Sequence, residues 1–355
     1  MERFAFVIHP ISVADVARKF SFARYLPDRW VEAAIKHLPP VKTSHITGIR
    51  SEHAEIEGWF VGCPLTPRQI MELPEDFVIR KVIAAGKLAE RLGAKILGLG
   101  AYTKIVGDAG ITVAKNLNIA VTTGNHYTVA TALEGTRQAA ELMGHKLCDS
   151  NVAVVGATGA IGGVAARILA REARTMTLVG RNENKLRLLA DKILYESGLA
   201  VHISSDLSAA LRKADVVVTV TSAVDAIIQP EDLKPGAVVC DVARPRDVSR
   251  RVVEVRDDVL VIEGGIVEVP GEVNFNFNFG FPAKTAYACM AETMILALEG
   301  RFENFTLGRD LSLEKVEEIG SLARKHGFRL AGFRSFERAI EPEEIANIRA
   351  RAFGS

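Results

Sequence analysis

A glycine-rich loop between two short apolar segments constrains the fold of this chain more than any other feature. Residues 151–181 read NVAVVGATGAIGGVAARILAREARTMTLVGR. The run at 152–155 is typical of a parallel strand buried on both faces. Gly156, Gly159 and Gly162 follow it, and apolar residues then recur with the spacing of a helix that lies on a sheet. The order strand, loop, helix, strand predicts an α/β fold with a Rossmann-type doubly wound parallel sheet.

The same loop predicts a dinucleotide site. Glycines at this spacing permit a tight turn and let the backbone approach a pyrophosphate, while the free N–H groups at the helix start attract its charge. The alternative is a Rossmann domain that binds no nucleotide. The residues expected to contact the cofactor here are Gly156, Thr158, Gly159, Ala160, Ile161 and Gly162.

The end of the second strand indicates which dinucleotide is bound. An NAD site usually has an acidic residue about 20 residues past the glycines, to hold the ribose 2′-hydroxyl. Arg181 and Asn182 occupy that place here. Because a guanidinium pairs well with a 2′-phosphate, the sequence predicts NADPH as the cofactor. Alternatively, Arg181 is a solvated residue at the start of the next helix.

The βαβ pattern continues to about residue 262 and gives six strands. Thr221 and Ser222 follow the fourth strand, at the carboxyl edge where ligands bind in open α/β sheets. Gly264 and Gly265 follow the sixth strand. They either let the backbone pass close to a nicotinamide ring or make a turn.

Composition limits the class of protein. The chain has 355 residues, enough for two domains, and its formal net charge of +1 argues against a nucleic-acid partner. It has no apolar run of about 18 residues and no signal-peptide layout at its start, so we expect a cytoplasmic protein without a transmembrane segment. Its four cysteines are widely spaced, which favours free thiols over disulfides or a metal site. A homo-oligomer is possible on this evidence, but the sequence does not predict one.

The segment TTGNHYT, residues 122–128, gathers hydroxyls, an amide and an imidazole where a strand ends and a helix begins. Asn125 and His126 could there polarise a carbonyl or stabilise an oxyanion. Ordinary capping of the helix by Thr123 or Asn125 explains the segment equally well.

Two further segments carry polar groups or aromatic residues in a pattern. Lys104 and Asp108 lie in a glycine-rich loop and could be the acid and base of a hydroxy-acid dehydrogenase, or solvated turn residues. NFNFNFGFP at 274–282 alternates polar and aromatic residues, which predicts a strand with Phe275, Phe277, Phe279 and Phe281 on one face.

Residues 285–298 are apolar on all sides and predict a central helix. Its one charged residue, Glu292, lies three residues after Cys289 and therefore on the same side. A buried carboxylate needs partners or a raised pKa, and its closeness to a thiol suggests chemistry. A buried cysteine is, however, also a common small core residue.

Taken together, these segments resemble the long-chain acyl-(acyl-carrier-protein) reductases of cyanobacteria. The match covers about residues 93–328 and is densest in TTGNHYT, GATGAIG, EGGIVE, YACMAE and ALEGRFENFTLGRDLS. The resemblance implies that Cys289 is a nucleophile that carries the acyl group, that the glycine loop binds NADPH, and that the partner is an acyl carrier protein or coenzyme A thioester. The histidine of TTGNHYT lies one position earlier than in that family, so the resemblance implies no role for His126.

On this basis we expect an N-terminal α/β substrate-binding domain at 1–148, a Rossmann domain at 149–283 and a C-terminal helical segment with the nucleophile at 284–355. The expected activity is NADPH-dependent reduction of a long-chain acyl thioester to a fatty aldehyde. Two alternatives stay open: a shikimate-type or amino-acid dehydrogenase that uses Lys104 and Asp108, and a non-catalytic NADP-binding protein. Basic residues such as Arg324, Lys325 and Arg329 are either solvated or a docking surface for an acidic carrier.

Overall fold

The structure is a computed structural model that describes residues 1–10, 12–13, 15–16, 25–104, 106–278 and 282–354. It divides into two compact units. Unit 1 contains Met1–Tyr127, Glu268–Asp310 and Ser321–Arg329, and unit 2 contains Thr128–Val267, Leu311–Gly320 and Leu330–Ser355. The predicted boundaries after residues 148 and 283 do not coincide with this division, because the chain beyond residue 267 contributes to both units.

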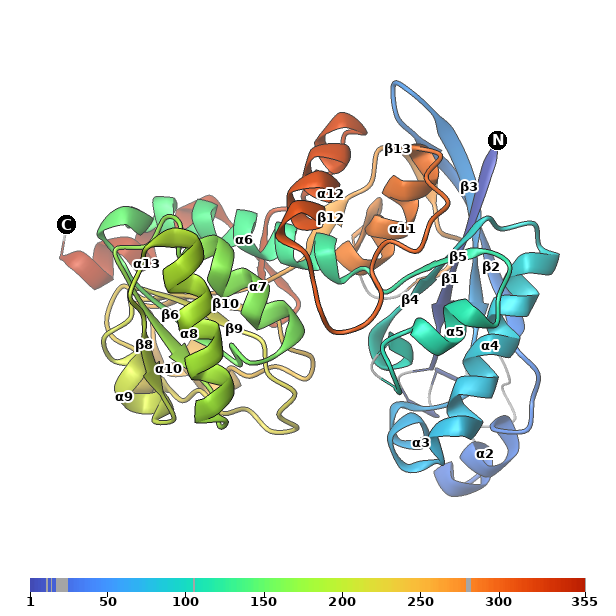
Figure 1. Cartoon of the computed structure of the whole chain (residues 1–355), viewed down its shortest axis with the longest axis horizontal. Coiled ribbons are helices and arrows are strands. Elements are labelled where there is room, and N and C mark those ends of the chain that lie inside the picture. The colour runs from blue at the N-terminus through green and yellow to red at the C-terminus, as the bar shows by residue number, and fades with distance from the viewer. Residues whose placement is uncertain (11, 14, 17–24, 105, 279–281, 355) are drawn as a thin grey trace. The chain divides into compact units, whose positions relative to one another are not determined.

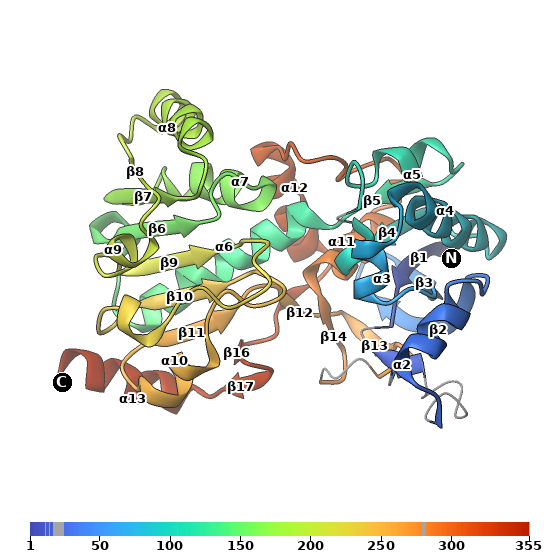
Figure 2. The same cartoon turned by 90° about the horizontal axis from the view of Figure 1, so that it is seen from below.

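Unit 2 has a parallel six-stranded sheet, which confirms the predicted Rossmann-type fold. In spatial order its strands are β8 (His202–Ser204), β7 (Thr175–Val179), β6 (Asn151–Val155), β9 (Val216–Thr219), β10 (Val238–Asp241) and β11 (Leu260–Glu263). Figure 2 shows this succession. If the six strands of this sheet are counted in chain order, their spatial order is 3-2-1-4-5-6, the doubly wound order of dinucleotide-binding sheets.

Helices cover both faces of this sheet. They include α7 (Ala160–Leu169), α8 (Glu183–Ser197), α9 (Leu207–Leu211), α10 (Arg250–Val255) and α13 (Pro342–Phe353). Figure 1 shows α7 and α8 next to each other. Side chains of β6 alternate between two cores: Val152 and Val154 belong to one, and Ala153 and Val155 to the other. This alternation explains why the strand is apolar throughout.

The remaining elements of unit 2 include some whose residues are divided between the two units. All are short except two helices. They are α6 (Asn125–Leu142), α12 (Leu313–Lys325), the 3₁₀ turns η3 (Leu147–Asp149) and η4 (Pro230–Asp232), and the strands β12 (Ile266–Glu268), β15 (Arg329–Leu330), β16 (Phe333–Ser335) and β17 (Arg338–Ile340). Strands β16 and β17 form an antiparallel pair.

Unit 1 has a mixed six-stranded sheet. Its strands in spatial order are β13 (Gly271–Asn274), β2 (Val41–Arg50), β3 (Glu55–Gly62), β1 (Glu2–Ile8), β4 (Ile96–Leu99) and β5 (Ala120–Thr122). Strands β1, β3, β4 and β5 run parallel, while β2 and β13 run antiparallel to their neighbours. The carboxyl ends of the parallel strands therefore meet at one edge, where β4 and β5 release the chain into loops.

Helices also cover the sheet of unit 1. They are α2 (Asp28–Ile35), α3 (Pro67–Glu72), α4 (Glu75–Arg91), the 3₁₀ turn η2 (Ala101–Lys104), α5 (Ile111–Lys115) and α11 (Ala288–Leu298). Apolar residues on one face of α4, including Val78 and Val82, are buried against residues such as Val7 of β1. Helix α11 lies against β1 and β4, where Gly98 leaves room for Thr293.

Two predicted elements differ from the structure. The predicted aromatic strand at 274–282 does not form in its described part: β13 stops at Asn274, and Asn276 has a φ of 46°, which turns the chain. The rings of both Phe275 and Phe277 contact Phe60, at centroid distances of 6.0 and 5.9 Å, while Phe279 and Phe281 lie outside the described residues.

The second difference concerns the apolar helix. It begins at Ala288 rather than at Thr285, because residues Thr285–Tyr287 form the strand β14. The N–H and the hydroxyl of Thr285 both donate to the carbonyl of Pro282, which fixes the turn before this strand. The later start moves Cys289 from the second turn of the helix to its first.

Candidate functional site

Cys289 is the second residue of α11 and the only residue of that helix whose side chain is not buried. The N–H groups of the first helical turn lack partners within the helix, and the helix dipole is positive there. The N–H groups of Cys289 and Met290 lie where they lower the pKa of the thiol. The fold therefore presents the thiol of a half-buried residue at a helix N-terminus, where the helix dipole favours a thiolate and burial opposes one.

The loop after β5 packs directly on Cys289. Gly124 has a φ of 74°, and a Cβ added there would lie 2.3 Å from the Cα and 2.6 Å from the Cβ of Cys289. Glycine is required at this position by both the left-handed backbone and the close approach. The predicted cluster TTGNHYT and the predicted nucleophile thus form one site within unit 1.

Glu292 lies one turn further along α11 and is fully buried. Its Oε1 accepts hydrogen bonds from the hydroxyls of Thr122 and Thr306, the latter at 2.6 Å, and its Oε2 accepts one from the Tyr127 N–H at 2.8 Å. Burial raises the pKa of Glu292, and these three donors and Lys104 oppose that effect. Three donors match the acceptor-only chemistry of an ionised carboxylate.

His126 is also buried, and its ring lies edge-on to Phe305. Its Nδ1 is 2.6 Å from the Thr306 hydroxyl oxygen, which in turn donates to Glu292. Because the hydroxyl has a single hydrogen and gives it to the carboxylate, it accepts from His126, so the proton of the imidazole is on Nδ1. His126 therefore supports the carboxylate network in this structure.

Asn125 begins α6, and its Oδ1 accepts a hydrogen bond of 2.8 Å from the Nζ of Lys104 at the end of η2. The predicted pair Lys104 and Asp108 does not form. Asp108 instead accepts from the N–H and the hydroxyl of Thr112 in the first turn of α5. These hydrogen bonds outweigh the effect of burial and lower the pKa of Asp108.

The pKa of the Cys289 thiol reflects opposing charges. Burial raises this pKa, the positive charge of Lys104 lowers it and the negative charge of Glu292 raises it, so that the overall direction is upward. The sequence places Cys289 and Glu292 on one helix face, but it does not reveal that Thr122 and Thr306 bind Glu292, or that Lys104, predicted as a partner of Asp108, acts on the thiol. No local pattern identifies them, because they are brought to α11 by the sheet and the long loop after it.

The glycine loop of unit 2 has the geometry that phosphate binding requires. Gly156 has a φ of 76°, and a Cβ there would lie 2.5 Å from the Val220 carbonyl oxygen. A Cβ at Gly162 would lie 2.4 Å from the Gly156 carbonyl oxygen. Gly159 is the N-cap of α7 and no side chain caps it, so that the first N–H groups of this helix, from Ala160 on, remain available to a phosphate.

The residues after β7 and β9, at the carboxyl edge of the unit 2 sheet, have different roles. Arg181 is exposed, and its contact with a 2′-phosphate stays a prediction, while Asn182 caps α8 by accepting from the Lys185 N–H at 3.0 Å. Thr221 uses its N–H and its hydroxyl to bind Asp247, so it shapes the loop instead of presenting a donor.

The other predicted cofactor residues lie in open or tightly turned backbone. Thr158 and Ser222 are exposed, and Ile161 is partly buried at the start of α7. Gly265 has a φ of 90°, a left-handed backbone that favours glycine, and a Cβ on Gly264 would lie 3.1 Å from the Val242 side chain. A nicotinamide contact at these two residues stays a prediction.

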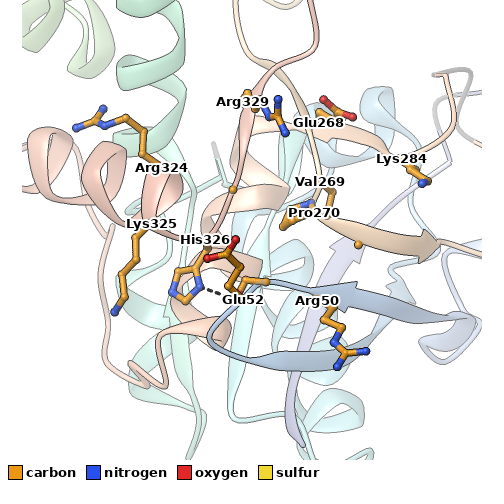
Figure 3. A pocket seen from close by; sticks show the side chains of 13 residues that line it. Arg50, Glu52, Glu268, Val269, Pro270, Lys284, Arg324, Lys325, His326 and Arg329 are labelled. Carbon is orange, nitrogen blue, oxygen red and sulfur yellow. Dashed lines mark hydrogen bonds between the residues drawn. The ribbon is translucent and has the colours of Figure 1, made fainter.

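A cavity of about 370 Å³ in unit 1 contains three of the basic residues noted in the sequence (Figure 3). Arg324, Lys325 and Arg329 line it together with Arg50, Lys284, Glu52 and Glu268. Lys325 pairs with Glu299 and Lys284 pairs with Glu272, so much of the positive charge is neutralised. A docking surface for an acidic carrier stays a prediction.

The described residues contain no cluster of three or more His, Cys, Asp or Glu side chains that could hold a metal ion. Nor does any described helix combine the length and apolar character needed to cross a bilayer.

The chain is similar to one family model and to curated proteins. A family model described as shikimate / quinate 5-dehydrogenase matches residues 137–263, which is most of unit 2. The chain is 29% identical to the long-chain acyl-[acyl-carrier-protein] reductase of Synechococcus elongatus over 88% of this chain and 94% of that protein. It is 32% identical to aminotransferase PigE of a Serratia species, over 98% of this chain but only 42% of that protein.

A solved structure of L-tryptophan dehydrogenase from Nostoc punctiforme aligns over 99% of this chain and 88% of that one, with 13% identity and a TM-score of 0.42. The chain is therefore related to NAD(P)-binding reductases, and it spans less than half of PigE.

Proposed function

We propose that this protein reduces a long-chain acyl thioester to an aldehyde, with Cys289 as the nucleophile and NADPH as the hydride donor. The observation that carries the proposal is the position of Cys289, a half-buried residue at the N-terminus of an otherwise buried helix, in contact with the loop at Gly124. The similarity to an acyl-(acyl-carrier-protein) reductase over nearly its whole length supports the substrate class.

In the first step, the Cys289 sulfur forms a bond to the carbonyl carbon of the substrate. The bond from that carbon to the carrier's sulfur breaks, and the departing thiolate takes up a proton. Because one thioester replaces another, the exchange is nearly balanced in free energy, and the protein needs mainly to position the groups and stabilise the oxyanion. The backbone N–H groups at the start of α11 are available for that purpose.

NADPH, when bound, would supply a hydride. Addition of hydride to the thioester carbon gives an anionic tetrahedral species on Cys289, and its C–O⁻ bond becomes the C=O of the aldehyde as the bond to the Cys289 sulfur breaks and regenerates the thiolate. A thiolate suits both steps because it is a strong nucleophile near neutral pH and a good leaving group.

Asn125, His126 and Glu292 have supporting roles in this proposal. Glu292 ties α11 to β5 and to the start of α6 through Thr122 and Tyr127, while His126 holds Thr306 in place. The network orients the turn that bears the thiol. Asn125 presents its amide at the same turn and binds Lys104.

The experiment is mass spectrometry after incubation with an acyl-carrier-protein thioester or an acyl coenzyme A, without NADPH. We expect an acyl adduct on the peptide that contains Cys289, and its conversion to free aldehyde when NADPH is added. The matched control is Cys148→Ser, because Cys148 is an exposed free thiol. The adduct should persist in Cys148→Ser and disappear in Cys289→Ala.

Other outcomes would favour the alternatives. Turnover of a small hydroxy acid that Cys289→Ala leaves unchanged would indicate a dehydrogenase, a function that fits less well because Asp108 is bound to Thr112. NADPH binding with no turnover of any thioester or hydroxy acid would indicate a non-catalytic nucleotide-binding protein.

A further inference from the structure

Lys104 is a cation near the proposed nucleophile. It ends the 3₁₀ turn η2, is partly buried, and donates from Nζ to the Oδ1 of Asn125 at 2.8 Å. Within the described part of the chain, no carboxylate forms an ion pair with it, and Asp108 is bound elsewhere. A partly buried ammonium group is costly unless hydrogen bonds or opposite charges compensate it, so its position needs a reason.

A hydrogen bond and a close backbone contact link Lys104 to Cys289. Asn125, which Lys104 binds, directly follows Gly124, and Gly124 lies against the Cα and Cβ of Cys289. The route comes from three separate segments: the loop after β4, the loop after β5 and the start of α11. All three belong to unit 1, so this juxtaposition is internal to one compact body.

The charges around Cys289 explain what Lys104 would do there. Two charged side chains act on the thiol among the described residues: Glu292 on its own helix, which raises the thiol pKa, and Lys104 on η2, which lowers it. Lys104 also lowers the pKa of Glu292. An ionised Glu292 would oppose a thiolate one turn away, and a cation on the other side offsets that repulsion.

We propose that Lys104 is a positioning residue for the reaction, whose ammonium group favours the thiolate form of Cys289 and orders the Asn125 loop against it. In the reduction this charge would also stabilise the oxygen that becomes anionic when hydride adds to the thioester carbon. That second part rests on the proposed function; the effect on the thiol does not.

The experiment measures the rate of Cys289 alkylation by iodoacetamide as a function of pH, with the modified peptide quantified by mass spectrometry. This readout needs no acyl substrate and follows the thiolate directly. The variants are Lys104→Met, Lys104→Arg and, as matched control, Lys115→Met on the exposed end of α5. A Cys148→Ser background removes the exposed competing thiol.

In Lys104→Met we expect the profile to move to higher pH and the rate at neutral pH to fall about tenfold, because the cation that favours the thiolate is lost. Lys104→Arg should retain most of the wild-type rate because it keeps the charge, and Lys115→Met should match the wild type. A Lys104→Met profile that superimposes on the wild-type profile would overturn the proposal.

A second variant covers the case in which Lys104→Met does not fold. Asn125→Asp has almost the same shape and offers Lys104 a carboxylate, which neutralises its charge in place. The proposal expects slower alkylation in Asn125→Asp, and an unchanged profile there would also overturn it. If the alkylation results hold but no acyl adduct forms on Cys289, the proposed function fails while the role of Lys104 toward the thiol stands.

Discussion

Gly124→Ala tests the close contact on which the whole site depends. The added methyl would enter a space already occupied, 2.3 Å from the Cα and 2.5 Å from the carbonyl oxygen of Cys289. Both atoms belong to the backbone of a buried helix, so they cannot move aside as the end of a flexible side chain can. The loop or the first turn of α11 must shift instead.

The chain offers a matched control at the other end of the same helix. Gly300 follows α11 with a φ of 70°, close to the 74° of Gly124, and a Cβ added at Gly300 meets nothing within 4 Å. Left-handed backbone costs a residue with a Cβ roughly 1–2 kcal/mol, and this cost applies to both glycines. Overpacking adds about 1–3 kcal/mol at Gly124 alone, so we expect Gly124→Ala to cost about 2–5 kcal/mol and Gly300→Ala about 1–2 kcal/mol.

Tryptophan fluorescence during urea denaturation is a suitable assay, because both tryptophans, Trp30 and Trp59, lie in unit 1. Alkylation of Cys289 provides the second readout, and we expect it to change several-fold in Gly124→Ala only, as the thiol leaves its place at the helix start. Equal losses of stability in the two variants, with equal alkylation rates, would refute the contact between the loop and Cys289.

Three further predictions concern the cofactor and the carboxylate network. Arg181→Glu should raise the KM for NADPH by about tenfold or more and leave the KM for NADH unchanged or lower, because a carboxylate repels a 2′-phosphate and accepts from a 2′-hydroxyl; equal changes for both cofactors in steady-state kinetics would contradict this. Thr306→Val should lower the free energy of unfolding by about 1–3 kcal/mol, since it leaves the Nδ1 proton of His126 without its partner, and denaturation curves check it. Burial raises the pKa of Glu292 above its ordinary 4.5, so the folded chain binds this proton more tightly than the unfolded chain does. The associated stability is complete below pH 4.5 and is lost as pH rises through the raised pKa, so the unfolding free energy of Glu292→Gln should fall less steeply over that range than that of the wild type.

Much of unit 2 could be predicted from the sequence because its signals are local. The strand at 151–155, the glycines after it and the helix stripe all occur within one βαβ unit, and the structure has them where the pattern predicts. The later strands could be predicted because the alternation of strand and helix patterns continues along the chain. The central place of α11 was also predictable, since a helix that is apolar on all sides has to be buried.

The start of α11 and the partners of Glu292 could not be predicted in the same way. Thr285–Tyr287 has no local feature that excludes a helix, and it is tertiary structure that makes it a strand. Thr122 and Tyr127 lie 170 and 165 residues from Glu292 along the chain, so only the folded sheet reveals that they are neighbours. The lone glutamate indicated that partners exist, but not which they are.

The buried carboxylate of Glu292 disfavours the thiolate of Cys289 but orders the elements around it. An ionised Glu292 costs desolvation free energy, and its charge opposes a thiolate at Cys289, one helical turn away. Neither the stability of the fold nor the reactivity of the thiol therefore explains why a glutamate lies here. Its three hydrogen bonds, however, come from β5, from the loop at Thr306 and from α6, the elements that surround Cys289. A nucleophile at the end of a helix has to be held to within a fraction of an ångström by the groups behind it. We therefore infer that Glu292 fixes the direction of the thiol, and that Lys104 supplies the opposite charge that keeps this arrangement compatible with a thiolate.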